Sequence, residues 1–558
     1  MDQMKNKFNL NNYFLITFNM DINKFKKNNN EIQYEYGKKT HVNILKEKNK
    51  KTFFIGDPFI NNKNYKNIFN FWQNNSENIE KFKQIDSEFV IIEVNNDKKI
   101  RIINSRFSSP QIYYYKDKNY FLVSTNYFVL AFILKKINKF ELNEDSIYEF
   151  LHFRRLFGNS TLDKRSKILE PAIYLKYHNG QIINTNYWKP KFNKKNESLN
   201  YFSSKIKKAI YNSEKIKIPK NTNGNYIMLS GGLDTRFISS IIKKFNGSFT
   251  LSYSDNREKR IANKIAEIVN MNHESIKIKK DHYKNNFYHN VRAIGGSYMG
   301  DSLLMGHTKI INKAKILYSG YGLDYFFQGM YIPVNFIKLF GKQTYFKLNK
   351  NIKEPVANFF YDNISYKNNC EYLDNLYDDE SKSSYKKKLL DKFNLILANT
   401  NQFDKLNNLE KYEKLNFHNI SRHITYGGQL AISEMSRHKV ISYTNELYDL
   451  YLEIPNKFRF DGRILKKTLK EINMKLANLI SANNNSRVVD SHIKLGIKHI
   501  FKHFFSKIYL YKNNIRNERT WNEIKDITNK DLREIIDNFD ISIFRELKSL
   551  NYHSYITI

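Results

Sequence analysis

Residues 226–239 read Tyr-Ile-Met-Leu-Ser-Gly-Gly-Leu-Asp-Thr-Arg-Phe-Ile-Ser, and this stretch decides the fold of the second half of the chain. An apolar run stops at Ser230-Gly231-Gly232, and a helical pattern resumes at once. That order is typical of a strand that turns directly into a helix. In a parallel sheet, such turns lie at the carboxyl ends of the strands, where ligands bind. We therefore expect a ligand site at this turn.

The residue types in the turn indicate a phosphate ligand. Two glycines let the backbone approach an anion closely, and the start of the following helix presents free N–H groups. Ser230 and Thr235 add hydroxyl donors. A glycine turn can also serve only the close packing of strand on helix. Asp234 favours a ligand, because a carboxylate beside bound phosphate needs a divalent cation between them, so the pattern predicts a magnesium nucleotide.

The rest of the chain divides into a β-rich part and an alternating part. Strand-like runs with short turns fill the sequence up to about residue 190, and a polar segment with a proline follows at 189–200. Beyond it, strand-like and helical stretches alternate, which predicts a parallel sheet with crossover helices. After about residue 385 the pattern is almost wholly helical. The strands expected in the alternating part are 226–229, 248–253 and 315–318.

Composition limits the class of protein. Among 558 residues, 92 Lys and Arg stand against 55 Asp and Glu, and the formal net charge of +37 favours anionic partners such as nucleic acid. Lysine-rich and asparagine-rich tracts such as 26–30 show that part of this charge can be solvated surface. A single cysteine, Cys370, excludes disulfides within the chain. No apolar run reaches the ~20 residues of a membrane span, so we expect a cytoplasmic protein.

Two motifs in a fixed order carry a family resemblance. The turn Ser230–Thr235 resembles the S-G-G-x-D-[ST] pyrophosphate loop of ATP pyrophosphatase domains. Residues 319–329, Ser-Gly-Tyr-Gly-Leu-Asp-Tyr-Phe-Phe-Gln-Gly, are similar to the S-G-E-G-x-D-E-x-F-x-G segment of asparagine synthetases. The stretch between them fits that family's E-x-x-x-A-x-x-x-A and H-E pattern, and weaker similarity extends over nearly the whole chain. The matching residues between the motifs are Glu258, Ala262, Ala266, His273 and Glu274.

The resemblance implies an α/β fold in two domains. Residues 1–195 would form a β-rich sandwich like that of N-terminal nucleophile (Ntn) hydrolases. Residues 196–558 would form a parallel-sheet ATP pyrophosphatase domain with a helical C-terminal part. Asp234 and Asp324 would hold Mg²⁺ on ATP, although an aspartate at the second position can also be an ordinary helix cap. The residues implied for the rest of the nucleotide site are Met228, Ser230, Gly231, Gly232, Thr235, Ser319 and Gly320, with Lys466 and Lys467 for the leaving pyrophosphate.

The N-terminus departs from the glutamine-dependent members of the family. Those enzymes begin with a cysteine whose own α-amine serves as the base. Here the corresponding residues are Asp2 and Gln3, and the nearest hydroxyl nucleophile is Thr17, inside an apolar run. We therefore expect the N-terminal domain to be inactive as a glutaminase.

Tyr321 stands where asparagine synthetases have glutamate. In that respect the motif is closer to β-lactam synthetase and carbapenam synthetase, whose tyrosine works with a glutamate from a later segment to accept the proton of the attacking amine. Glu354 is nearest by spacing, and Glu371 follows it. Tyr321 can also be a packing residue, because the chain contains 39 tyrosines.

The sequence thus predicts an ATP-dependent ligase that forms AMP and pyrophosphate and joins a carboxylate to an amine or ammonia. The identity of the carboxylate and of the amine is not encoded in any motif. Two alternatives stay open at this point. The basic charge and the pyrophosphate loop also suit a tRNA-modifying enzyme, and both domains can have decayed into a noncatalytic scaffold.

Overall fold

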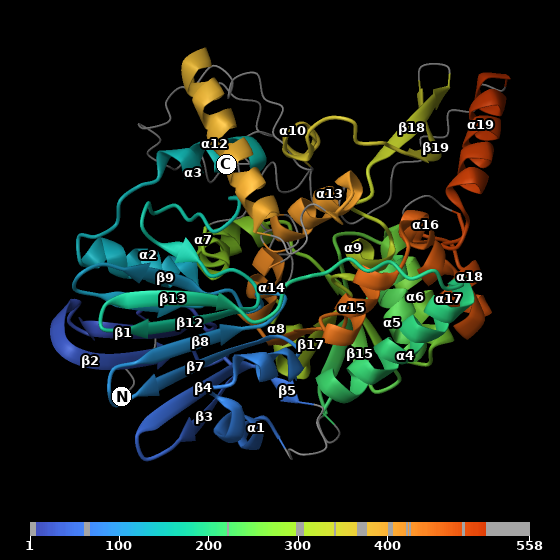
Figure 1. Cartoon of the computed structure of the whole chain (residues 1–558). Coiled ribbons are helices and arrows are strands. Elements are labelled where there is room, and N and C mark those ends of the chain that lie inside the picture. Colours follow the sequence, from blue (N-terminus) through green and yellow to red (C-terminus); the bar gives the residue numbers. More distant parts are fainter. Residues whose placement is uncertain are drawn as a thin grey trace.

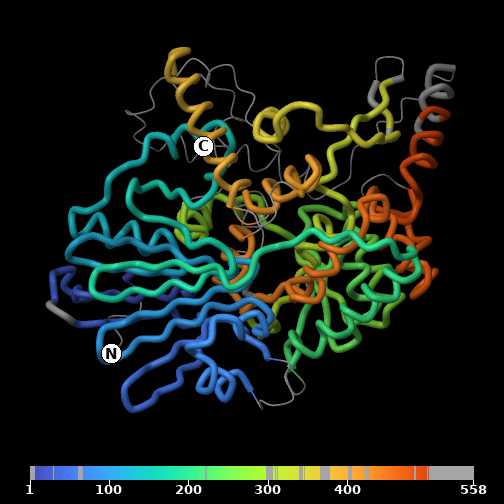
Figure 2. The backbone as a smooth tube through the Cα atoms, viewed as in Figure 1, coloured from blue at the N-terminus to red at the C-terminus, as the bar shows by residue number. Residues whose placement is uncertain are grey.

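The computed structural model describes residues 7–60, 67–219, 223–296, 306–339, 342–364, 377–399, 405–419, 422, 426–482 and 486–508. Figures 1 and 2 show two halves that lie side by side, a stack of sheets and a helix-rich half. The polar segment that follows residue 186 crosses between them and leads into helix α4 (Leu199–Lys217). Within the described ranges, no helix is long and apolar enough to cross a bilayer.

Two antiparallel sheets form the first half, as the strand-like runs predicted. The first sheet has the order β11 (Lys167–Ile168), β9 (Tyr113–Lys116), β10 (Phe121–Ser124), β1 (Phe14–Asp21) and β2 (Lys26–Tyr36). The second has the order β13 (Gln181–Asn186), β12 (Ile173–His178), β8 (Ile100–Asn104), β7 (Phe89–Asn95), β4 (Lys50–Gly56) and β3 (Val42–Lys46).

Alternation along the strands builds the core between these sheets. In β1, Phe14 and Ile16 point inward and pack with Phe53 and Ile55 of the facing sheet. Leu15 points to the opposite face, where helix α2 (Tyr127–Lys136) and residues of the second half cover it. The two-residue period of a strand therefore places one face in the sandwich and the other against the next domain.

A five-stranded parallel sheet forms the centre of the second half. Its order is β16 (His273–Lys277), β15 (Gly247–Ser252), β14 (Asn225–Met228), β17 (Ile316–Ser319) and β20 (Arg437–Val440). Helices α5 (Leu233–Ile241), α6 (Arg257–Ile268) and α7 (His282–Ile294) connect the strands. The predicted strands β14, β15 and β17 are confirmed to within one residue, and so is the α/β fold class.

The strand order reverses between β14 and β17. From β14 the chain first adds β15 and β16 on one side, and it then returns to place β17 and β20 on the other. In open parallel sheets, ligands bind outside the carboxyl ends of the strands at such a switch point. The fold therefore puts the turns after β14 and β17 side by side.

Beyond the switch point the described chain is mostly helical. The main helices are α12 (Asp379–Ala398), α13 (Asn408–Asn416), α14 (Tyr426–Ser433), α15 (Asn445–Glu453), α17 (Arg463–Ile472) and α19 (His492–Ile508). Helix α12 returns to the first half, where Lys388 pairs with Asp145 of α3 (Glu144–Phe153) at 2.7 Å. Strand β20 departs from the helical pattern predicted after about residue 385. Strand β16 and the hairpin of β18 (Val334–Leu339) and β19 (Lys342–Asn349) were not among the predicted strands either.

Candidate nucleotide site at the switch point

The two turns at the switch point are packed against each other at Gly320. A Cβ atom on this glycine would lie 3.1 Å from Asp234 Cβ and 3.2 Å from Thr235 Cγ2. Any side chain here would push the turns apart. The sequence-predicted residues Asp234, Thr235 and Gly320 are thus brought together by the structure.

Internal hydrogen bonds shape the glycine turn. The Ser230 N–H donates to Thr235 Oγ1 at 3.1 Å, the two hydroxyl oxygens are 3.2 Å apart, and the Gly232 N–H donates to Ser230 Oγ at 3.3 Å. Helix α5 begins directly after Gly232 and has no side-chain cap. Its first N–H groups are therefore the kind of donors that bind an anion at a helix N-terminus.

Arg236, which the sequence did not single out, fixes this turn from behind. Its guanidinium is fully buried and donates to Gly231 O at 3.0 Å. The same group donates to three carbonyl oxygens at the end of helix α18 (Met474–Asn478), namely those of Leu476, Leu479 and Ile480 at 3.1, 2.9 and 3.0 Å. Gly231 also has no room for a side chain, because a Cβ there would lie 2.7 Å from Ala482 Cβ. A distant helical segment therefore holds the turn in place.

Asp234 and Asp324 form a buried acidic pair. Burial raises the pKa of both carboxyls, and the charge of Asp324 raises the pKa of Asp234 further. Gln328 Nε2 donates to Asp234 Oδ1 at 2.5 Å, and the Tyr325 N–H donates to Asp324 Oδ1 at 2.9 Å. Among the described residues no basic side chain pairs with either carboxylate, and two buried carboxylates side by side fit a divalent metal ion.

The donor set also matches how Mg²⁺ is usually held. Within the described ranges, no group of three or more His, Cys, Asp or Glu side chains could form a complete protein cage for a metal. Mg²⁺ in nucleotide sites is typically bound by one or two carboxylates, with phosphate oxygens and water completing the shell. The pair Asp234 and Asp324 has this composition.

The residues implied for the adenosine side lie at the ends of the same strands. Met228 ends β14 and is half-buried, and Ser319 ends β17 and is buried. The Ser319 hydroxyl lies 2.9 Å from His438 Nε2 of β20. Ser319 therefore joins the strand end to its neighbour, and its role toward a nucleotide stays a prediction.

Tyr321 lies between β20 and α14. Its ring is edge-on to His438, with centroids 6.2 Å apart, and its carbonyl accepts a hydrogen bond from Ser442 Oγ. A Cβ on Gly428 would lie 3.1 Å from the Tyr321 hydroxyl oxygen. Glu354 is exposed, directly before α10 (Val356–Asp362), and Glu371 lies outside the described residues. The tyrosine–glutamate dyad stays a prediction.

The two lysines implied for pyrophosphate both have acidic partners on or near α17. Lys466 Nζ donates to Asp461 Oδ2 at 2.8 Å and to Asp490 O at 3.1 Å. Lys467 pairs with Glu471 at 2.7 Å. Either lysine would have to leave its carboxylate to reach a phosphate, so their role stays a prediction.

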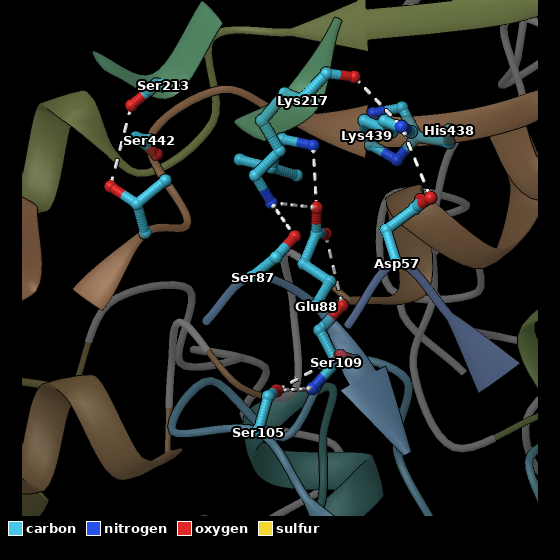
Figure 3. Close-up of polar contacts among 12 residues, drawn as sticks. Asp57, Ser87, Glu88, Ser105, Ser109, Ser213, Lys217, His438, Lys439 and Ser442 are labelled. Atoms are coloured by element: carbon cyan, nitrogen blue, oxygen red, sulfur yellow. Dashed lines mark hydrogen bonds and ion pairs between the residues drawn. The ribbon is translucent and has the colours of Figure 1, made fainter. Parts of the chain in front are cut away.

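A buried polar cluster joins the first half to the strand beside this site (Figure 3). Lys217 Nζ, at the end of α4, donates to Ser87 Oγ at 2.7 Å and to Glu88 Oε2 at 2.9 Å. Glu88 Oε2 also accepts the Val440 N–H at 3.0 Å. Lys439 Nζ donates to Lys217 O at 2.9 Å and lies 3.2 Å from Asp57 Oδ1. No local sequence signal marks this cluster, because its members come from both halves.

The start of the first half is also tied to the second. The N–H groups of Asn11 and Asn12 donate to the carboxylate of Glu434 at 2.5 and 2.9 Å. Thr17 is buried in the middle of β1, where its hydroxyl donates to Met20 O at 3.1 Å. The region before β1 therefore contacts the segment between α14 and β20.

Residues 226–420 match the family model of asparagine synthase. The expected family resemblance is confirmed for this region. The asparagine synthase region includes the glycine turn and both aspartates of the acidic pair, and it ends before β20. Comparison with curated proteins gives no significant match.

Three solved structures show weak similarity to the chain. One is the allosteric regulatory enzyme of purine biosynthesis, at 6% identity and a TM-score of 0.21. Another is the glutamine phosphoribosylpyrophosphate amidotransferase from B. subtilis complexed with ADP and GMP, at 5% and 0.21. Each of these matches covers 49% of this chain and 61% of the other, about three fifths of its length. NMN synthetase from Francisella tularensis matches at 17% and 0.19, over 41% of this chain and 96% of its own. Such low TM-scores carry no information about activity.

Proposed function

We propose that the chain is an ATP-dependent amide ligase that produces AMP and pyrophosphate. The observation that carries this proposal is the buried pair of Asp234 and Asp324 beside a glycine turn at the switch point of the sheet. The match of residues 226–420 to asparagine synthase supports a carbon–nitrogen ligase of this type.

The proposed reaction has two steps. An oxygen of the substrate carboxylate attacks the α-phosphorus of ATP, the bond between the α-phosphorus and the bridging oxygen breaks, and pyrophosphate leaves. An amine or ammonia then attacks the acyl carbon, loses a proton and displaces AMP. The net products are an amide, AMP and pyrophosphate.

Each part of the site has a role in this scheme. The N–H groups at the start of α5 and the hydroxyls of Ser230 and Thr235 would bind the leaving pyrophosphate. Asp234 and Asp324 would hold a magnesium ion, which supplies positive charge against the phosphates. Arg236 keeps the turn in one conformation, so that its donors are already oriented before ATP binds.

The direct test measures pyrophosphate release with ATP, Mg²⁺ and a panel of carboxylate and amine pairs. We expect Asp234→Asn and Asp324→Asn each to abolish release while the protein stays folded. Asp379→Asn is the matched control, because that side chain is fully exposed on α12. Near wild-type turnover in both variants of the pair would refute the proposed site.

We also propose that free ammonia or an amine, and not glutamine, donates nitrogen. Thr17, the hydroxyl nucleophile expected nearest to the glutaminase position, is fully buried within β1. Incubation of the purified protein with glutamine, with and without ATP, is expected to yield no glutamate above background. Glutamate release that is lost in Thr17→Val would contradict this expectation.

A further inference from the structure

A cavity of about 310 Å³ lies between the two halves, away from the acidic pair. On one side it is lined by the loops after β8 and β13 and by Glu170, and on the other by the end of α12 and the segment that follows Lys414. We call it the interdomain cavity. Its volume falls within the range of sites for small organic molecules, about 300–1,000 Å³.

Aromatic rings form one wall of the interdomain cavity. Phe107 stacks on Tyr443, with centroids 4.6 Å apart and an interplanar angle of 3°. Tyr448 lies beside both Trp188 and Phe417, at centroid distances of 5.1 and 5.0 Å. Rings in this arrangement offer a flat apolar surface to a ligand.

Basic side chains dominate the opposite wall. Glu170 is the one carboxylate among the lining residues, and it is shared by Arg422 at 3.0 Å and His418 at 3.1 Å. Within the described part of the chain, the ammonium groups of Lys189 and Lys414 have no hydrogen-bond or ion-pair partner. The wall therefore carries more positive charge than its own acid neutralises.

The surroundings of Lys414 show the cost of this excess charge. Burial lowers the pKa of its ammonium to about 8, and although Glu170 opposes the shift, the charges of Arg422 and Lys189 add to it. Like charges held together at a partly buried site destabilise one another. A bound anion would supply the missing negative charge.

We propose that the interdomain cavity binds a small organic anion, with its carboxylate or phosphate group at Lys189 and Lys414 and its flat apolar body against Phe107 and Trp188. This site is distinct from the candidate nucleotide site. It is linked to that site by Tyr443, whose hydroxyl lies 2.6 Å from the Tyr325 hydroxyl, next to Asp324.

The binding test uses benzoate, phenyl phosphate, inorganic phosphate and neutral benzamide, without ATP, by calorimetry and thermal shift. We expect benzoate and phenyl phosphate to bind with a stoichiometry of one and to raise the melting temperature. Benzamide lacks the charge and inorganic phosphate lacks the apolar body, so each should bind at least about tenfold more weakly than phenyl phosphate. Because ATP is absent, the outcome is independent of the ligase assay.

Variants distinguish binding in the interdomain cavity from unspecific attraction of anions to a basic protein. The double variant Lys189→Met/Lys414→Met should weaken phenyl phosphate binding at least tenfold. Its melting temperature without ligand should not fall, because it removes unpaired charges. Lys195→Met is the matched control, since its ammonium pairs with Glu453 at 2.7 Å outside the cavity.

Trp188→Leu tests the aromatic wall. It should weaken the binding of phenyl phosphate and leave the binding of inorganic phosphate unchanged. Equal binding of phenyl phosphate to the double variant and to wild type, or of benzamide and benzoate to wild type, would overturn the proposal.

Discussion

At the scale of single residues, the two carboxylates of the acidic pair suit a metal ion but lower the stability of the ligand-free protein. Burial raises the pKa of Asp234 and Asp324, so the folded state holds their protons more tightly than the unfolded state does. Stability is therefore lost as the pH rises from the ordinary carboxyl pKa of about 4 through the raised values. We expect Asp324→Asn, without ligand, to melt at a higher temperature than wild type at pH 7, and the difference to shrink toward pH 4.

Thermal melts over this pH range check the sign of the effect. Asp379→Asn, at a fully exposed side chain, should show no such trend. Added Mg²⁺ and ATP should stabilise wild type and leave Asp324→Asn unchanged, because ligands that bind only the folded state raise its stability. A wild-type protein more stable than Asp324→Asn at pH 7 without ligand would mean that another charge already neutralises the pair.

Tyr321 is the candidate for the base that accepts the proton of the attacking amine. If it accepts the amine proton, Tyr321→Phe should keep the exchange of labelled pyrophosphate into ATP and slow amide formation by ~100-fold or more. Glu354→Gln should have the same effect if Glu354 is its partner, and the double variant should lose little more, because residues that act as a unit are not additive. Amide formation at the wild-type rate in Tyr321→Phe would assign the ring to packing between β20 and α14.

At the scale of elements, Arg236 connects the start of α5 to the end of α18. In Arg236→Met, the buried carbonyls of Gly231, Leu476, Leu479 and Ile480 lose their donor, which should lower the free energy of unfolding by about 2–5 kcal/mol. Because Gly231 belongs to the glycine turn, which would bind the phosphates of ATP, the KM for ATP should also rise. Denaturant melts and initial rates measure the two effects, and a stability loss with unchanged KM would limit Arg236 to a structural role.

Which elements could be predicted depends on where their stabilising partners lie. Strands β14, β15 and β17 are buried apolar runs, so the local pattern was sufficient. Strand β20 reads Arg437-His438-Lys439-Val440 and has no apolar pattern. Its charges are stabilised by Asp57 and by the neighbourhood of Glu88, far away in the sequence. No local signal could reveal that strand.

The same distinction holds for the candidate site. Ser230, Asp234 and Asp324 were predictable because each lies in the turn after a strand or in the first turn of the next helix. Arg236 was not, since its partners lie at 476–480, and neither was the interdomain cavity, whose basic wall joins Lys189 to Lys414. The acidic partner of Lys466 was also not predictable, because Asp461 reaches it through the kink before α17.

At the scale of the whole molecule, the buried Lys217–Glu88 pair is one of the contacts that stabilise the two halves against each other. Lys217→Met leaves the Glu88 carboxylate buried without its cation, and Glu88→Gln leaves the Lys217 ammonium without its anion, so each should destabilise the protein by about 3–5 kcal/mol. The double variant should lose clearly less than the sum. The exposed pair of Lys164 and Glu141, at 3.0 Å, is the control, and its coupling should be much weaker than that of Lys217 and Glu88. Additive losses at Lys217 and Glu88 would show that other contacts hold the halves together.

The cluster of Asp57, Glu88 and Lys217 also bears on how such a chain can evolve. Strand β20 carries basic side chains whose counter-charges belong to the first half. If recombination replaced the first half with an unrelated β-sandwich, those side chains would be buried without acidic partners. They lie on the strand that pairs with β17, which precedes Tyr321. We therefore expect the two halves to be inherited together, so that selection on the second half would retain a first half that performs no reaction of its own.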